Sequence, residues 1–214
     1  HASEALRGDR EVALAAARQN ARALEHARPE LLADPDFVLE AVRRKRRALE
    51  YAAESLRTDR AFVLKAVETK GGALKYAPEE LQEDPEVVMA AVVQDPSAMQ
   101  YASDDLQLDL RFVTKVATAQ GPALQYLDDE FKSNPTVVLA AAKQNEDALK
   151  HADEGLWGER KFILDAVAVR AVALSYVTED TVRMDKTLML QALQRKPEAF
   201  QYVAPELRAD RAFV

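Results

Sequence analysis

The sequence contains no cysteine and little glycine, proline or tryptophan, with 6 Gly, 9 Pro and 1 Trp among 214 residues. The absence of cysteine excludes disulfides, thiolate metal sites and thiol catalysis. The low glycine and proline content excludes a collagen-like or loop-dominated chain. No apolar run approaches the ~20 residues that a membrane-spanning helix needs, so no membrane span is expected.

Positive charge is also in deficit, because 29 Lys and Arg face 36 Asp and Glu and leave a formal net charge of -7. Binding to a phosphate backbone needs clustered Lys and Arg. The charge balance and the expected absence of a solvent-facing aromatic ladder therefore disfavour nucleic acid as a partner. A hydrophobic content of 48% is too high for a disordered chain.

The sequence repeats itself with a period of 25 residues. Residues 51–75, YAAESLRTDRAFVLKAVETKGGALK, align without a gap with residues 76–100, YAPEELQEDPEVVMAAVVQDPSAMQ. When the recurrent Ala-Leu pair is placed at positions 3 and 4, repeats begin near residues 21, 46, 71, 96, 121, 146, 171 and 197. Such a short period indicates stacked repeats, in which each repeat packs on its neighbours. We expect residues 1–214 to form a single repeat array. Because they begin and end within a repeat, we also expect them to be a segment of a longer array.

Each repeat contains the pattern of two helices. Apolar residues at positions 3, 4, 7 and 11 suit one helical face, and proline near positions 8 and 9 indicates a break followed by a short turn. Apolar residues at positions 17, 18, 21 and 22 suit a second helix, which Gly or Pro at position 1 ends. The sequence predicts an all-α fold, an α-solenoid of about eight and a half 25-residue two-helix repeats.

Position 14 carries a residue type that caps helix N-termini. Its members are Asp9, Asp34, Asp59, Asp84, Asp109, Asn134, Asp185 and Asp210. A row of carboxylates could also line a groove for a cation. Proline often follows directly, at the first helical position where a missing N–H costs nothing. We therefore interpret this row as helix caps and expect no metal site there.

Every Tyr and His occupies position 6: His1, His26, Tyr51, Tyr76, Tyr101, Tyr126, His151, Tyr176 and Tyr202. Histidines can form metal or acid–base sites, but His26 and His151 lie five repeats apart. We interpret position 6 as a structural ladder of buried rings between repeats. The sequence also contains no phosphate-binding loop, nucleophile elbow or zinc-binding helix motif. No catalytic, cofactor-binding or metal-ligating residue is predicted, and no cofactor is expected.

The pattern ALxYAxxxLxxDxxFVLxAVxxx, present in residues 48–70 and echoed in all the complete repeats, resembles the domain-of-unknown-function family 4116. The resemblance implies a tandem helical-repeat fold and brings no established catalytic residue or cofactor. The sequence departs from the pattern at Glu159, at an extra residue near Thr181, and at the bulky Leu127 and Phe131.

Apolar residues at positions that are otherwise polar are the first candidates for a partner contact. Trp157 occupies position 12, where other repeats carry Arg, Gln or Lys, and Leu108 and Leu110 interrupt positions that are mostly small, polar or Pro. Val169 and Val172 belong to an apolar stretch around a helix end. Exposed apolar patches mark contact surfaces, and Trp is enriched among dominant contacts. Alternatively, repacking around the nearby glycines buries Trp157 within its own repeat.

A basic run provides the second candidate, with Arg43, Arg44 and Arg47 as its contact residues. It reads Arg43-Arg44-Lys45-Arg46-Arg47 and spans the junction between two repeats. Basic residues at this point favour a helix C-terminus electrostatically. A docking site for an acidic partner is the alternative.

Together these features predict a non-enzymatic helical-repeat scaffold for protein–protein interaction, such as an accessory subunit of a larger assembly. Stacked helical repeats present a long surface that suits a protein partner or an extended peptide. The alternative is a regulatory or targeting array attached to an enzyme or effector domain outside residues 1–214. The sequence does not identify the partner.

Overall fold

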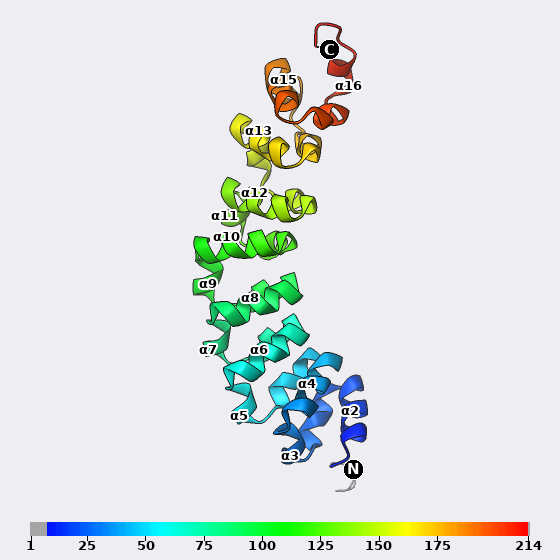
Figure 1. Cartoon of the computed structure of the whole chain (residues 1–214), viewed down its shortest axis with the longest axis vertical. Helices are drawn as coiled ribbons and strands as arrows, with labels where there is room; N and C mark the ends of the chain where they lie inside the picture. The colour runs from blue at the N-terminus through cyan, green and yellow to red at the C-terminus, as the bar shows by residue number, and fades with distance from the viewer. Residues whose placement is uncertain (1–7, 214) are drawn as a thin grey trace. The chain divides into compact units, whose positions relative to one another are not determined.

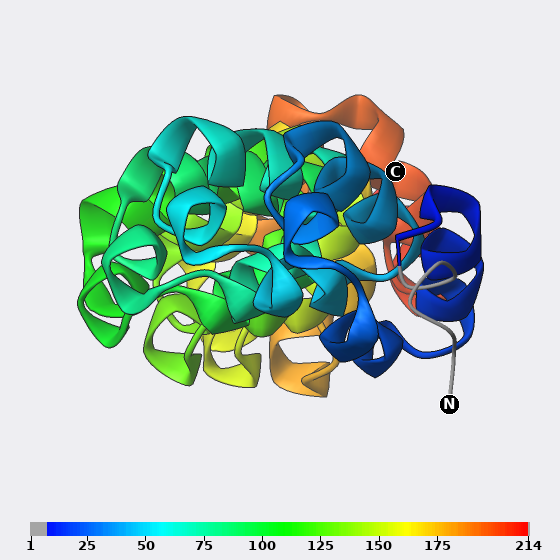
Figure 2. The same ribbon diagram turned by 90° about the horizontal axis from the view of Figure 1, so that it is seen from below.

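The computed structural model describes residues 8–213, and every element in this range is helical (Figures 1 and 2). Each repeat contributes a six-residue 3-10 helix at positions 1–6, a short helix near positions 9–12 and a ten-residue α-helix at positions 15–24. The predicted all-α repeat fold is confirmed. None of the helices within residues 8–213 combines the length and apolar character needed to cross a membrane.

The long helices are α2 (Arg10–Gln19), α4 (Pro35–Arg44), α6 (Arg60–Thr69), α8 (Pro85–Gln94), α10 (Leu110–Ala119), α12 (Pro135–Gln144), α13 (Arg160–Val169) and α15 (Lys186–Arg195). The 3-10 helices at positions 1–6 are η1 (Ala21–His26), η2 (Arg46–Tyr51), η3 (Gly71–Tyr76), η4 (Pro96–Tyr101), η5 (Gly121–Tyr126), η6 (Glu146–His151), η8 (Ala171–Tyr176) and η9 (Pro197–Tyr202). The short helices are α3 (Pro29–Leu32), α5 (Glu54–Arg57), α7 (Glu79–Gln82), α9 (Asp104–Leu108), α11 (Asp129–Lys132), η7 (Glu154–Gly158), α14 (Asp180–Arg183) and α16 (Pro205–Arg208).

The chain forms two compact parts, His1–Asp109 and Leu110–Val214. Within the first part, α2, α4, α6 and α8 pack in order, and η1 to η4 form a second row. Within the second part, α10, α12, α13 and α15 pack in order, with η5, η6, η8 and η9 as the corresponding row. Repeats therefore stack on their sequence neighbours inside each part.

The core of each part comes from the apolar positions that the sequence indicates. In α6, for example, Phe62 is 5% exposed, while Val63, Ala66 and Val67 are fully buried. Ala48 and Leu49, at positions 3 and 4, are buried as well. Small side chains at positions 3 and 21 let the 3-10 helix lie close to the long helix.

The first helix of each repeat is a 3-10 helix, a detail that the sequence pattern did not distinguish from an α-helix. Its hydrogen bonds join residues three apart, as between the amide of Ala48 and the carbonyl of Lys45 at 2.8 Å. In three repeats a side chain at position 25 caps it: Asn20, Asp95 and Asn145 each accept from the amide two residues later.

Glycine at position 1 lets the chain pass close to the backbone of the next long helix. An added Cβ on Gly71 would lie 2.3 Å from the carbonyl oxygen of Ala91, and one on Gly121 would lie 2.5 Å from that of Ala141. None of the described glycines has a positive φ. The long helix thus ends before position 1 without a left-handed glycine, and these glycines are needed for packing against the end of the next long helix.

Candidate functional site

The capping residue at position 14 also joins neighbouring repeats. Asp34 accepts from the amides of Asp36 and Phe37 through Oδ1, at 2.9 and 3.3 Å, while its Oδ2 accepts from Arg10 Nη1 at 2.9 Å. The same arrangement recurs between Arg60 and Asp84, where Nε and Oδ2 are 2.6 Å apart. Ion pairs at the equivalent positions link Arg160 to Asp185 and Lys186 to Asp210. The predicted helix caps are confirmed for Asp59 and Asp84.

The junction between α10 and α12 replaces both members of this ion pair. Position 15 is Leu110, which is 48% exposed, and position 14 of the next repeat is the neutral Asn134. Asn134 keeps the capping function, since its Oδ1 accepts from the amides of Thr136 at 3.0 Å and Val137 at 3.4 Å. The change therefore removes a charge pair while leaving the start of α12 intact.

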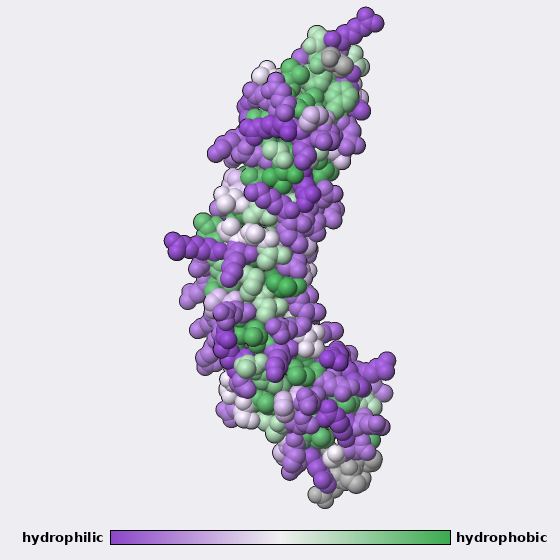
Figure 3. Space-filling model, viewed as in Figure 1, coloured by the Kyte–Doolittle hydropathy of each residue, from purple (hydrophilic) through white to green (hydrophobic). Residues whose placement is uncertain are grey.

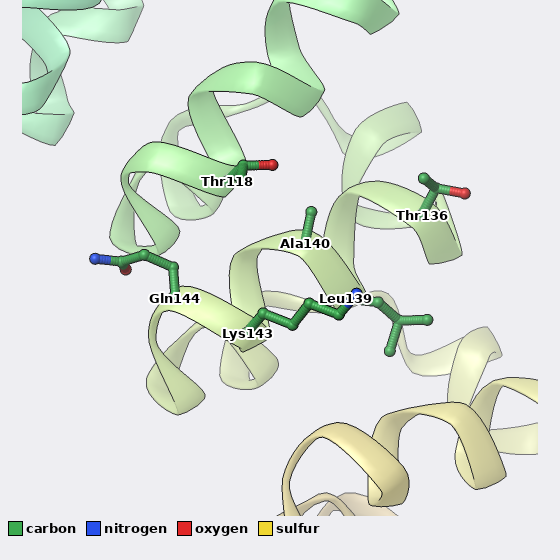
Figure 4. A pocket seen from close by; sticks show the side chains of 6 residues that line it. All are labelled: Thr118, Thr136, Leu139, Ala140, Lys143 and Gln144. Carbon is green, nitrogen blue, oxygen red and sulfur yellow. The ribbon is translucent and has the colours of Figure 1, made fainter.

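A groove of 490 Å³ lies on the same two helices (Figure 4). Thr118 of α10 and five residues of α12 line it: Thr136, Leu139, Ala140, Lys143 and Gln144. We call it the α10–α12 groove. At the level of these helices, weakly coloured side chains, neither strongly hydrophilic nor strongly hydrophobic, gather in the space-filling view (Figure 3). The apolar residues of its lining are Leu139 and Ala140, and the small side chain of Ala140 leaves room between the two helices.

Charge on these two helices has one sign. Neither α10 nor α12 contains Asp or Glu, whereas they carry Arg111, Lys115 and Lys143. Lys115 and Lys143 are exposed and form no ion pair with another residue in the described range. Since the chain as a whole is acidic, this pair of helices is a local positive surface.

The polar groups of the groove are mainly hydrogen-bond donors. Gln144 Oε1 accepts from the amide of Gly121 at 2.8 Å, which leaves its amide nitrogen as a donor. The hydroxyl of Thr118 donates its proton to the carbonyl of Thr114 at 2.8 Å. The amide nitrogen of Gln144 and the ammonium of Lys143 therefore remain as donors for a ligand that supplies acceptors.

The C-terminal end of α12 is held from the following repeat. Arg170 donates from Nε to the carbonyl of Ala142 at 3.0 Å and from Nη2 to the carbonyl of Lys143 at 2.8 Å. The last carbonyls of a helix otherwise lack partners. Arg170 therefore fixes the backbone at Ala142 and Lys143, while the amide of Gly121 fixes the side chain of Gln144.

The structure contradicts the predicted exposure of Trp157, which is only 7% exposed. Its indole stacks on the ring of Tyr176 in the next repeat, at 5.3 Å between centroids, and meets Phe162 edge-on at 5.1 Å. Position 12 points inward: Gln82, for example, donates from Nε2 to the carbonyls of Leu74 and Ala77. Trp157 therefore fills a packing position between two repeats, and a partner surface centred on it is wrong.

The other predicted apolar contacts differ in exposure. Leu108 is 58% and Leu110 48% exposed, whereas Val169 and Val172 are half-buried at the junction between α13 and η8. Of these four residues, Leu110 belongs to the helix pair that forms the α10–α12 groove. The structure does not bring Val169 or Val172 into its lining.

The basic run is exposed, as a docking site would require, but neighbouring acids pair with two of its contact residues. Arg44 donates to Glu40 at 2.8 Å, and Arg47 donates to Glu50 at 2.7 Å. The guanidinium of Arg47 also lies 5.8 Å from the ring centroid of Tyr51, and the hydrogen bond to Glu50 raises its pKa further. Arg43 is exposed. Local pairing lowers the charge that this run offers to a partner.

The rings at position 6 are half-exposed, so the expected buried ladder is wrong. Tyr76 and Tyr101 are intermediate in exposure and Tyr126 is 36% exposed; His1 lies outside the described residues. Such a ring can be covered by a cation rather than by core side chains. Lys75 Nζ, for example, lies 5.6 Å from the ring centroid of Tyr101. Because rings do face solvent, only the net charge still disfavours nucleic acid.

Two side chains at position 6 have shifted pKa values. Burial, followed by the charges of Lys132 and Lys150, lowers the pKa of His151, and burial raises the pKa of Tyr176. Within residues 8–213, no three His, Asp or Glu side chains are grouped so that they could hold a metal ion.

The sequence pattern did not point to the residues of the groove, since each of them conforms to its repeat position. Two signals could have found them. One is the absence of Asp and Glu from residues 110–119 and 135–144. The other is the presence of Leu110 and Asn134 at positions where several other repeats carry Arg and Asp.

Most of the chain matches the model of a known protein family. The model of a family described as Domain of unknown function (DUF4116) matches residues 1–32, 34–82, 59–107, 84–132 and 109–157. The overlapping matches follow the 25-residue period, and they end before Glu159 and the one-residue insertion near Thr181. No curated protein and no solved structure matches the chain.

Proposed function

Because the chain belongs to the DUF4116 family of tandem repeats, whose description names no activity, we propose that it is a non-enzymatic scaffold that binds a protein partner. In this proposal the partner contacts the long helices of the C-terminal part, at the α10–α12 groove and Leu110. The scaffold serves as an accessory subunit of a larger assembly.

One observation carries the proposal: the junction between α10 and α12 has Leu110 and Asn134 where the Arg10–Asp34, Arg60–Asp84, Arg160–Asp185 and Lys186–Asp210 pairs join other repeats, and it presents an apolar, positively charged surface instead. Leu110 is 48% exposed, and the groove combines Leu139 and Ala140 with the ammonium of Lys143. A fold needs neither the exposed leucine nor two unpaired lysines on adjacent helices. Apolar surface rimmed by polar groups is typical of protein contacts.

The chemistry of the groove favours binding over catalysis. Its lining has Thr, Leu, Ala, Lys and Gln but no carboxylate or imidazole, and acid–base catalysis draws mainly on those groups. The alternative proposal is a regulatory or targeting array attached to an enzyme or effector domain in a longer chain. A catalytic motif in the parent sequence would favour this alternative.

Site-specific photo-crosslinking tests the proposed surface. A photoreactive amino acid would replace Ala140, at position 20 of α12, in the full chain expressed in its own cells. The matched control carries it at Ala90, which occupies the same position on α8 and has the same intermediate exposure. We expect a discrete crosslinked protein at position 140 and none at position 90.

Equal crosslinking at both positions, or none at either, would contradict binding at the α10–α12 groove. Lys143→Glu in the Ala140 crosslinking variant provides a second readout, because it reverses the charge without filling the groove floor.

A further inference from the structure

We propose that the α10–α12 groove binds an acidic, extended or helical segment of the partner, with carboxylates held by Lys143 and the amide nitrogen of Gln144 and an apolar side chain seated on Leu139 and Ala140. This inference rests on the proposed function and narrows it to one class of partner.

The donors and acceptors of the groove determine the ligand chemistry. Lys143 and the amide nitrogen of Gln144 are donors, while the acceptor oxygen of Gln144 is engaged by Gly121 and the hydroxyl proton of Thr118 by Thr114. A ligand with several acceptors and negative charge satisfies such a site, and carboxylates do so with charge-assisted bonds. A basic segment would meet unpaired like charges.

Lys143 provides the positive charge of the groove. It is one turn from Leu139 on α12, so its ammonium lies at the edge of the apolar surface. Lys115 is on α10 but does not belong to the lining. Neither helix carries an acid that would neutralise Lys143.

The opposite features of α8 provide an internal comparison. Its sequence PEVVMAAVVQ resembles that of α12, PTVVLAAAKQ, with Glu86 in place of Thr136 and Val93 in place of Lys143. No Lys or Arg occurs on α8. α8 therefore lacks the positive charge that α12 carries, so this charge is not a general property of the repeat.

Other occupants have different requirements. A single-stranded nucleic acid would also supply negative charge, but its bases need stacking platforms, and neither α10 nor α12 exposes an aromatic ring, since Phe112 is buried. A second copy of this chain could supply acids from a turn such as Asp128–Glu130. Both become outcomes of the test.

The experiment measures binding of fluorescent synthetic peptides to the full chain by anisotropy at low salt. One peptide alternates Glu with Leu, a second carries Gln in place of every Glu, and an oligothymidine of equal charge is the third ligand. The protein variants are Lys143→Glu and the control Lys65→Glu, which reverses the charge of an exposed lysine on α6.

We expect the Glu–Leu peptide to bind, the Gln peptide to bind at least about tenfold more weakly, and added salt to weaken the first selectively. Lys143→Glu should lose about tenfold in affinity, and Lys65→Glu should change the affinity by less than about twofold. Circular dichroism confirms that each variant is folded.

Absence of binding by the Glu–Leu peptide, or equal losses of affinity in Lys143→Glu and Lys65→Glu, would overturn the inference. Tighter binding of oligothymidine would overturn it in favour of nucleic acid. A dimer of the free chain that Lys143→Glu dissociates would overturn it in favour of self-association. If Ala140 still crosslinks a partner whose capture is insensitive to Lys143→Glu, the scaffold function stands and only the acidic partner is rejected.

Discussion

Arg60 reaches from the first turn of α6 to Asp84, the residue that caps α8 in the next repeat. The guanidinium donates to Oδ2 of Asp84 at 2.6 Å, while Oδ1 accepts from the amides of Glu86 and Val87 at 2.8 and 3.2 Å. One carboxylate thus starts a helix and joins two repeats. Asp59 caps α6 through the amide of Ala61, but the residue opposite it in the preceding repeat is Pro35, which has no charge to offer.

Comparison of Asp59 with Asp84 separates the effect of capping a helix from the effect of joining two repeats. Asn caps a helix about as well as Asp, so Asp59→Asn should leave the melting temperature nearly unchanged. Asp84→Asn keeps the cap but loses the charge that Arg60 binds, so we expect a lower melting temperature. Asp84→Ala should lower the melting temperature further, because loss of the cap costs ~0.5–2 kcal/mol of unfolding free energy. Calorimetry of the three variants measures the change. Equal melting temperatures for Asp59→Asn and Asp84→Asn would contradict a role of the Asp84 carboxylate in both capping and joining repeats.

The same contact predicts a dependence of stability on acid. The hydrogen bond from Arg60, supported by those from the amides of Val87 and Glu86, lowers the pKa of Asp84. Its contribution is complete above the unfolded-chain pKa of about 3.9 and is lost as the pH falls through the lower pKa of the folded state. Urea unfolding at a series of pH values should show a smaller loss of stability below pH ~4 in Asp84→Asn than in the wild type. A parallel loss would contradict this role.

Most of the fold follows from the sequence because the information is local and repeated. Asp84 and Asp59 cap their helices as position 14 predicts, and the apolar pairs at positions 17, 18, 21 and 22 are buried. The 3-10 geometry of the first helix could not be distinguished, since six residues contain too few turns for a period of 3.0 to differ clearly from one of 3.6.

Burial of Trp157 predicts a structural effect. Trp157→Ala removes contacts with both Tyr176 and Phe162 and should destabilise the C-terminal part by ~3–5 kcal/mol, the range for large aromatic truncations in a core. Trp157→Phe keeps a ring and should lose less. Thermal unfolding measures both. An unchanged midpoint in Trp157→Ala would show that the side chain is exposed.

The close approach at Gly121 predicts strong sensitivity to a single methyl group. Gly121→Ala would place Cβ 2.5 Å from the carbonyl oxygen of Ala141, so we expect it to lower the melting temperature and to disturb the contact with Gln144. Gly158→Ala is the control, because its Cβ would meet nothing nearer than Glu179 at 3.9 Å. That variant should be neutral or stabilising by ~0.4–1 kcal/mol. Equal destabilisation by both variants would contradict the packing role of Gly121.

The site was less predictable than the fold, for a physical reason. An apolar residue that breaks a polar pattern is either exposed or buried by a neighbour, and sequence spacing alone does not separate the two. Leu110 is exposed, whereas Trp157 is covered by the ring of Tyr176 from another repeat. The groove itself depends on which side chains of two helices remain free, and this depends on contacts between residues far apart in the sequence, such as that of Gln144 with Gly121, 23 residues away.

Hydroxyl-radical footprinting of the chain, alone and with the protein crosslinked through Ala140, tests the central claim most directly. Leu139 in the groove and Leu64, at the same repeat position on α6, are both intermediate in exposure. We predict that the partner slows oxidation of Leu139 and Leu110 and leaves that of Leu64 unchanged. Protection of Leu64 without protection of Leu139 would contradict binding at the α10–α12 groove.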